Sequence, residues 1–221
     1  MKTLILLLFV FLASVLYIKG GAERNSSPKY LKEKVHESPT LSTLQDGDLA
    51  LRRTNTVYSQ VSEMITVGEK RYSHSGIIII IDNNYYVVHS TFDKKKGYDG
   101  ITKSSVKDFF ADATLWATYR FNLKKETRDA IADEAVSALD RNITFDTLGN
   151  LDTDDKLYCS EFVMKTVNKK VNMEFISPTV HTIKKKWMPL ILGADLQMDA
   201  VSMSDLYDNK KASLIQESHI K

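Results

Sequence analysis

The amino-acid sequence predicts an α+β fold in which an antiparallel sheet packs against helices. Five consecutive isoleucines, Ile77 to Ile81, indicate a central strand that is buried on both faces. The turn residues Asp82-Asn83-Asn84 and the β-forming run Tyr85 to Ser90 follow directly, which is typical of a hairpin. Lys124 to Arg141 repeats apolar residues at helical spacing and is the clearest amphipathic helix of the chain.

The same rules place the other elements. The segment after about residue 170 is mixed, and Ser177-Pro178 and Pro189 interrupt any regular pattern there. In chain order we expect a turn at Gln45–Asp48, a strand at Leu49–Arg52, a helix at Val57–Val67, a loop at Phe92–Gly100, a short helix capped by Ser104 or Ser105 and ending at Phe110, a strand at Thr114–Phe121 and a helix at Lys156–Lys170.

Composition excludes several classes of protein. The 221 residues carry 30 Lys and Arg against 28 Asp and Glu, and this near-neutral balance argues against a protein that follows nucleic-acid phosphates. A single Cys rules out an internal disulfide and any zinc site made of four cysteines. Apolar residues make up 43% and charged residues 26% of the chain, which is ordinary for a globular domain.

The N-terminus has the features of a secretory signal peptide at residues 1–22. Lys2 supplies a positive start, Leu4 to Ile18 are almost wholly apolar, and the small residues Gly20 and Ala22 suit a cleavage site. The apolar run is shorter than the ~20 residues of a membrane span, although an uncleaved anchor is the alternative. We therefore expect an exported protein with a polar lead-in at residues 23–43, a single domain at residues 44–221, and no membrane span after signal removal.

Cys159 is the candidate nucleophile. It lies in the first turn of the expected helix, where backbone N–H groups and the helix dipole favour the thiolate. The same N–H groups could hold the oxyanion of a tetrahedral intermediate. The alternative is an inert cysteine on an apolar helix face, because Phe162 and Val163 follow at helical spacing.

Five histidines could serve as the base. His36 and His219 lie in polar terminal segments, and His181 stays open as a candidate. His74 and His89 belong to the two strands of the expected hairpin.

The expected hairpin register sets these two imidazoles apart. If the turn is centred on Asn83, His89 falls opposite Ile77, about three residues out of step with His74. Contact then requires a slipped register or a bend at Gly76, and the alternative is two structural histidines.

We predict no metal and no cofactor. The sequence lacks the close ligand pairs of zinc sites, such as two Cys or His residues within one turn. Asp46-Gly47-Asp48 resembles part of a calcium loop but lacks the later ligands, which favours a turn.

Four segments together resemble the YiiX-like branch of the NlpC-type papain-like hydrolases. They cover roughly residues 44–180, and the histidine strand precedes the cysteine helix, which resembles the circularly permuted arrangement of that branch. The segments are Gly47-Asp48-Leu49-Ala50-Leu51-Arg52, Ser73-His74-Ser75-Gly76-Ile77-Ile78, Val87-Val88-His89-Ser90 and Tyr158-Cys159-Ser160-Glu161-Phe162-Val163.

The resemblance implies a permuted papain-like fold and roles for three residues. Cys159 matches the nucleophile and His74 the general base. The third group, which orients the base, is commonly Glu in that family, whereas His89 stands at its place here. A neutral imidazole stabilises an imidazolium less well than a carboxylate does, and Glu161 is a distant substitute that more naturally braces the cysteine helix.

The function expected from these residues is an exported cysteine hydrolase that cleaves an amide through an acyl-enzyme, with peptidoglycan peptides as a candidate substrate. One alternative is a lipid amide or ester hydrolase or acyltransferase at the same site. Trp187 to Leu192 could line a lipid pocket, although core packing explains this stretch better. Another alternative is a catalytically silent binding domain. The expected partner is a peptide or acyl substrate, cell-wall peptide or lipid, and not a nucleic acid.

Overall fold

The structure is a computed structural model that describes residues 38–54, 71–93, 97–147, 149–183, 196–208 and 210–218. The expected signal peptide, most of the lead-in, the helix at Val57–Val67 and the apolar stretch at Trp187–Leu192 lie outside these residues. Within them, no helix combines the length and the apolar character that crossing a bilayer requires.

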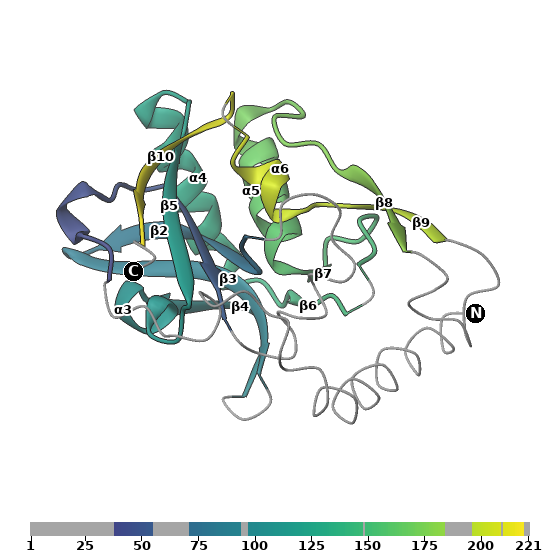
Figure 1. Cartoon of the computed structure of the whole chain (residues 1–221), viewed down its shortest axis with the longest axis horizontal. Helices are drawn as coiled ribbons and strands as arrows, with labels where there is room; N and C mark the ends of the chain where they lie inside the picture. Colours follow the sequence, from purple (N-terminus) through teal and green to yellow (C-terminus); the bar gives the residue numbers. More distant parts are fainter. Residues whose placement is uncertain are drawn as a thin grey trace.

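An antiparallel sheet of six strands forms the centre of the described fold (Figure 1). Its spatial order is β10-β5-β1-β2-β3-β4, so the strand latest in the sequence occupies one edge, beside β5. That edge pairing was not expected from the mixed pattern of the C-terminal segment. The strands are β1 (Leu49–Arg53), β2 (His74–Ile81), β3 (Asn84–Asp93), β4 (Tyr98–Ser105), β5 (Leu115–Phe121) and β10 (Ala212–Glu217).

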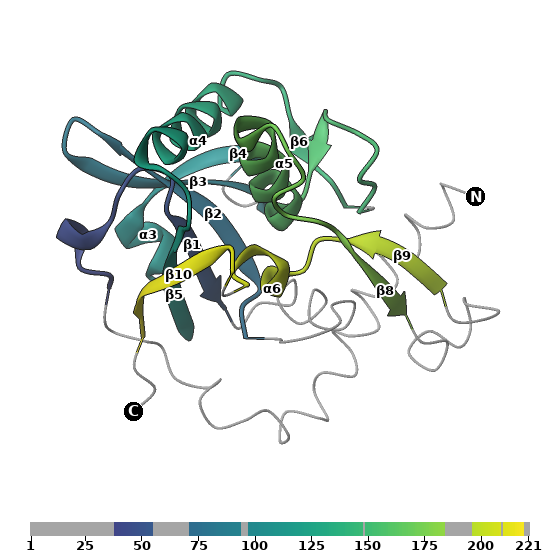
Figure 2. The same cartoon turned by 90° about the horizontal axis from the view of Figure 1, so that it is seen from above.

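Helices cover both faces of this sheet (Figure 2). Helices α4 (Lys125–Ala138) and α5 (Cys159–Val171) pack on one face, and the short α3 (Val106–Phe110) packs on the other. The isoleucine run divides between the two layers, because Ile77 and Ile79 join the core under α4 and α5 while Ile78 joins the core under α3. The structure thus confirms the α+β class and the strand buried on both faces.

Two expected boundaries are wrong. The segment Phe92–Gly100, expected as a loop, is largely strand, since β3 runs to Asp93 and β4 begins at Tyr98. The helix expected from Lys156 begins at Cys159, because Lys156 and Leu157 form β7 and pair with β6 (Thr144–Phe145). The smaller elements are η2 (Leu41–Thr43), β8 (Thr179–Ile183), β9 (Leu196–Ala200) and α6 (Met203–Leu206).

The β2–β3 hairpin has a two-residue turn. Asp82 and Asn83 both have positive φ, 48° and 60°, as a tight hairpin turn of the favoured twist requires. Asn84 already belongs to β3 and pairs with Ile81. The centre therefore lies between Asp82 and Asn83, and the register differs by one residue from the one expected with Asn83 at the centre.

Asp48 anchors the turn that precedes β1. Its carboxylate is fully buried and accepts hydrogen bonds from Arg120 Nε (2.8 Å), Arg120 Nη2 (2.7 Å) and the Gln45 backbone N–H (2.8 Å). Nearby, Asp46 Oδ1 accepts from the Ile80 N–H at 2.8 Å. These carboxylates are thus engaged by the protein itself, as in a structural turn.

Replacing Asp48 by Asn leaves Arg120 without its ionic partner beside the core. We expect the free energy of unfolding, measured by urea denaturation, to fall by about 3 kcal/mol, because breaking a largely buried ion pair strands a charge. Lys125→Ala is the control, since its pair with Asp129 is exposed and should change stability by less than about 0.5 kcal/mol. Equal losses in the two variants would contradict a structural role for the buried pair.

Candidate active site

Cys159 is the first residue of α5, and several contacts fix the start of that helix. Glu161 Oε2 accepts a hydrogen bond from the Tyr158 N–H at 3.2 Å, which caps the helix. The Tyr158 hydroxyl accepts from the Val201 N–H at 2.8 Å, and Ser160 Oγ donates to Val201 O at 2.7 Å. The helix start is thereby tied to the segment between β9 and α6.

The sulfur of Cys159 lies where β2 and β3 part. Their pairing ends at Ile77 and Val88, although both strands continue. Beyond that point the backbone N–H of Ser75 is directed at the sulfur, joined by N–H groups of the helix start. The Ser75 N–H belongs to the peptide that joins His74 to Ser75, so the sulfur lies beside the strand position of His74.

The ionisation of Cys159 differs from the expectation. Burial raises the pKa of its thiol, and this outweighs the lowering by donors that favour the ionised form, namely the N–H and hydroxyl of Ser75 and the N–H groups of the helix start. The helix N-terminus alone favours a thiolate, but at this partly buried residue the loss of hydration outweighs that effect. The resting group is therefore a neutral thiol at pH 7.

His74 and His89 are in direct contact. His74 Nε2 lies 3.0 Å from His89 Nδ1, and the two rings are perpendicular. The hairpin register explains the contact, since it carries His89 to the position opposite Gly76 rather than Ile77. His74 and Gly76 share one face of β2, so the imidazoles are diagonal neighbours on that face. The expected three-residue offset is therefore wrong.

Gly76 makes this approach possible. A Cβ on Gly76 would lie 3.0 Å from His89 Cβ and 2.7 Å from Val88 O, both closer than ordinary contacts. Any larger residue would push β3 away from β2 at the level of the histidines. The hairpin contact thus depends on the absence of a side chain at this position.

Ser104 extends the pair to a row of three polar side chains. His89 Nε2 lies 3.0 Å from Ser104 Oγ, which reaches it from the neighbouring strand β4. The sequence suggested Ser104 or Ser105 as a helix cap, and the structure separates the two roles. Ser105 caps α3 by accepting from the Asp108 N–H, while Ser104 binds His89.

Phe109 and Arg52 enclose the histidines on the α3 side of the sheet. The ring of Phe109 stacks on His74 at 5.5 Å, and the guanidinium of Arg52 lies 4.6 Å from the Phe109 centroid. Arg52 also forms an ion pair with Asp112 at 2.6 Å and stands opposite His74 in the β1–β2 register. Burial, the charge of Arg52 and His89 together hold the pKa of His74 well below its usual range. His74 is therefore uncharged at neutral pH.

The structure brings some of the candidate residues together and leaves others apart. No hydrogen bond joins Cys159 to His74 in the described part of the chain, although the thiol lies beside the His74–Ser75 peptide. His181 lies in β8, outside the main sheet, and its Nε2 is 2.9 Å from Thr179 Oγ1. His36 and His219 lie outside the described residues.

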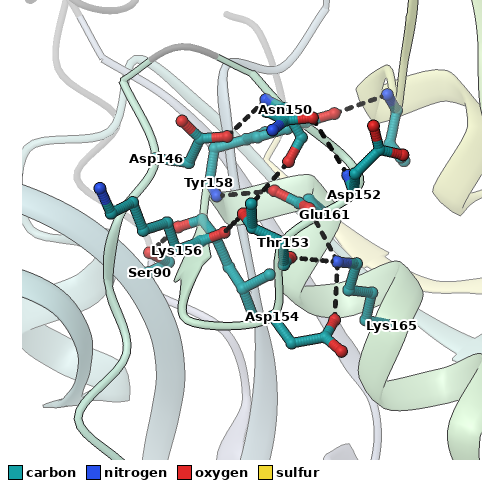
Figure 3. Close-up of polar contacts among 12 residues, drawn as sticks. Ser90, Asp146, Asn150, Asp152, Thr153, Asp154, Lys156, Tyr158, Glu161 and Lys165 are labelled. Atoms are coloured by element: carbon teal, nitrogen blue, oxygen red, sulfur yellow. Dashed lines mark hydrogen bonds and ion pairs between the residues drawn. The ribbon is translucent and has the colours of Figure 1, made fainter.

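Glu161 does not reach the histidines and belongs to a separate polar cluster (Figure 3). It is fully buried, and Lys165 Nζ lies 3.2 Å from its Oε1. Lys165 also donates to Thr153 O and, at 2.8 Å, to Asp154 Oδ1. Burial raises the pKa of Glu161 to about 7, even though Lys165 lowers it. This carboxyl supports the helix start, as the sequence indicated.

Within the described residues, no group of three or more His, Cys, Asp or Glu side chains is arranged to hold a metal ion.

Comparisons with known proteins agree with this fold and residue order. A family described as permuted papain-like amidases, YaeF/YiiX, C92 family, matches residues 43–213. The crystal structure of the metalloprotein yiiX from Escherichia coli O157:H7 superposes with a TM-score of 0.61 at 18% sequence identity, over 80% of this chain and 98% of that chain. No curated protein matches the sequence significantly.

Replacing Glu161 by Gln tests the buried carboxyl. A carboxyl whose pKa rises from 4.5 to about 7 on folding binds more protons in the folded chain, so its contribution to stability is lost as pH rises through that window. Between pH 5 and pH 8 we expect the wild type to lose about 2 kcal/mol relative to Glu161→Gln in urea unfolding.

Asp154→Asn is the matched control, because Asp154 contacts the same lysine but is exposed and its pKa is lowered. Its stability difference from the wild type should stay constant over the same pH range. Parallel pH profiles for Glu161→Gln and the wild type would show that Glu161 titrates normally.

Proposed function

The chain belongs to the C92 family of permuted papain-like amidases, which makes it a cysteine hydrolase, and we propose that Cys159, His74 and His89 carry its chemistry. The observation that supports this assignment best is the hydrogen-bonded row of His74, His89 and Ser104. Cys159, the single cysteine of the sequence, places its sulfur beside the first residue of that row.

The hydrogen bonds are compatible with a tautomer of each histidine that suits proton transfer. If His74 donates from Nε2 to His89 Nδ1, its own Nδ1 is left unprotonated and free to take a proton. His89 then carries its proton on Nε2 and donates to Ser104 Oγ. In this arrangement His89 fulfils the orienting role with a neutral ring, and Ser104 holds that ring in place by accepting its hydrogen bond.

The reaction starts from neutral groups. As Cys159 Sγ attacks the carbonyl carbon of an amide, its proton passes to His74 Nδ1, and the carbonyl becomes an oxyanion near backbone N–H groups. His74 then returns the proton to the leaving nitrogen, which departs as an amine and leaves a thioester. Water, deprotonated by His74, releases the acid and restores the thiol.

Neutral resting groups have a kinetic consequence. The thiolate forms during attack rather than beforehand, because burial raises the pKa of Cys159 and lowers that of His74. Among the described residues no hydrogen bond joins the Cys159 sulfur to an imidazole, and such contacts tighten when substrate binds.

We propose export and a peptide of the cell wall as the setting of this chemistry. The signal-like segment at residues 1–22 supports export to the periplasm or the extracellular space. The mass of the purified mature protein tests the first point, since an intact Met1 would contradict cleavage. Acylated lipids are the competing substrates, because the same acyl transfer chemistry would act on them.

Cys159→Ala and His74→Ala should each lower the rate of amide hydrolysis at least 100-fold. The urea concentration at half-unfolding should stay close to that of the wild type. Purified muropeptides and acylated lipids are incubated separately with the full mature protein, and products are read by mass spectrometry. Products from lipids alone would overturn the peptidoglycan assignment, and unchanged rates in Cys159→Ala would overturn the whole mechanism.

Neighbouring serines provide the matched control for the row. Ser104→Ala should lower kcat about tenfold, because His89 loses the hydrogen bond that holds its ring against His74. Ser105→Ala should leave kcat near the wild-type value and reduce stability instead by about 1 kcal/mol, since it removes a helix cap.

A further inference from the structure

Ser75 is a buried polar residue at the site that the mechanism above does not use. It lies between His74 and Gly76 in β2 and is fully buried. Its hydroxyl has no hydrogen-bond partner of regular geometry within the described residues. The other serines around the site differ in this respect, since Ser90 Oγ donates to Leu157 O at 2.5 Å and Ser160 Oγ to Val201 O at 2.7 Å.

The direction of Ser75 follows from the strand. Successive residues of β2 point to opposite faces, so Ser75 faces the α4 and α5 layer while His74 faces α3. Cys159 packs against the core of that same layer. Both the backbone N–H and the hydroxyl of Ser75 act on the Cys159 sulfur. Consecutive residues of one strand thus offer a base on one face and a donor on the other.

The charge state of the sulfur explains the unpartnered hydroxyl. A thiol is a weak acceptor, so the resting Cys159 gives Ser75 Oγ little to bind. A buried hydroxyl without a partner is destabilising, and a core position facing apolar α5 would be better filled by Ala. A thiolate is a strong acceptor, and a hydrogen bond to a charged group is about twice as strong as a neutral one. The hydroxyl therefore matches the ionised state, not the resting one.

We propose that Ser75 is a positioning residue whose hydroxyl donates a hydrogen bond to the Cys159 thiolate once the proton has left the sulfur. This role rests on the proposed function only in taking Cys159 as the nucleophile. Ser75 Oγ keeps its own proton throughout, and the proton from sulfur goes to His74.

A neutral donor suits this site better than a cation. A second positive charge beside the sulfur would add to Arg52, which already lowers the pKa of His74. The base would then be weaker. A hydroxyl stabilises the thiolate without changing the charge near His74, so it favours proton transfer to His74 without weakening that base.

The test is the pH dependence of alkylation of Cys159 by iodoacetamide in the full mature protein. Ser75→Ala should move the midpoint of the rate profile up by about one pH unit and lower the rate at pH 8 about tenfold. Ser75→Thr keeps a hydroxyl and should stay within a few tenths of a unit of the wild type. Ser75→Gly serves as the second hydroxyl-free variant if Ser75→Ala does not fold.

Thr118→Val is the matched control. Thr118 lies in β5, is fully buried, and its hydroxyl also lacks a partner of regular geometry within the described residues. Its replacement removes a comparable group without touching the site and should leave the alkylation profile unchanged. An unchanged midpoint in folded Ser75→Ala or Ser75→Gly, or a Thr variant that behaves like Ala, overturns the proposal.

The alkylation test of Ser75 and the hydrolysis test of the proposed function can fail independently. Alkylation reports on the sulfur without any substrate, so a shifted midpoint supports the hydrogen bond even if no amide is hydrolysed. Conversely, loss of hydrolysis in Cys159→Ala together with an unshifted midpoint in Ser75→Ala leaves the enzyme assignment intact and removes only the role of Ser75.

Discussion

The register of the β2–β3 hairpin is the constraint on which the site depends. Side chains alternate between the faces of a strand, so a shift of one residue would carry His89 to the α4 and α5 side, away from His74. The two-residue turn at Asp82 and Asn83 fixes this register through two positive φ angles. Gly76 then allows the strands to lie close enough for the rings to meet.

The same hairpin also determines where the Cys159 sulfur lies. Where the pairing ends after Ile77 and Val88, the free backbone of β2 faces the start of α5 instead of β3. Ser90 of β3 donates to Leu157 O, just before the helix, and so joins the diverging strand to the segment that delivers Cys159. The end of β2–β3 pairing thus brings the histidine strand and the start of the Cys159 helix to the same place.

The sequence predicted the α+β class, the buried isoleucine strand and the amphipathic α4, because each is marked by local periodicity. It named Cys159, His74 and His89 as candidates through residue type and the family resemblance. It missed what depends on contacts between distant segments. The contact of His89 with His74 required the true turn centre, and the role of Ser104 required the pairing of β3 with β4. The thiolate expected at a helix start did not allow for burial of the sulfur, and the edge position of β10 left no pattern in its own residues.

The raised pKa of Cys159 bears on chemical survival as well as on rate. Peroxides and related oxidants attack thiolates far faster than thiols, so a sulfur that stays protonated at rest is a poor target for them. The chain has no other cysteine that could shield this one as a reversible disulfide. The burial that raises this pKa therefore also lowers the reactivity of the proposed nucleophile towards such oxidants.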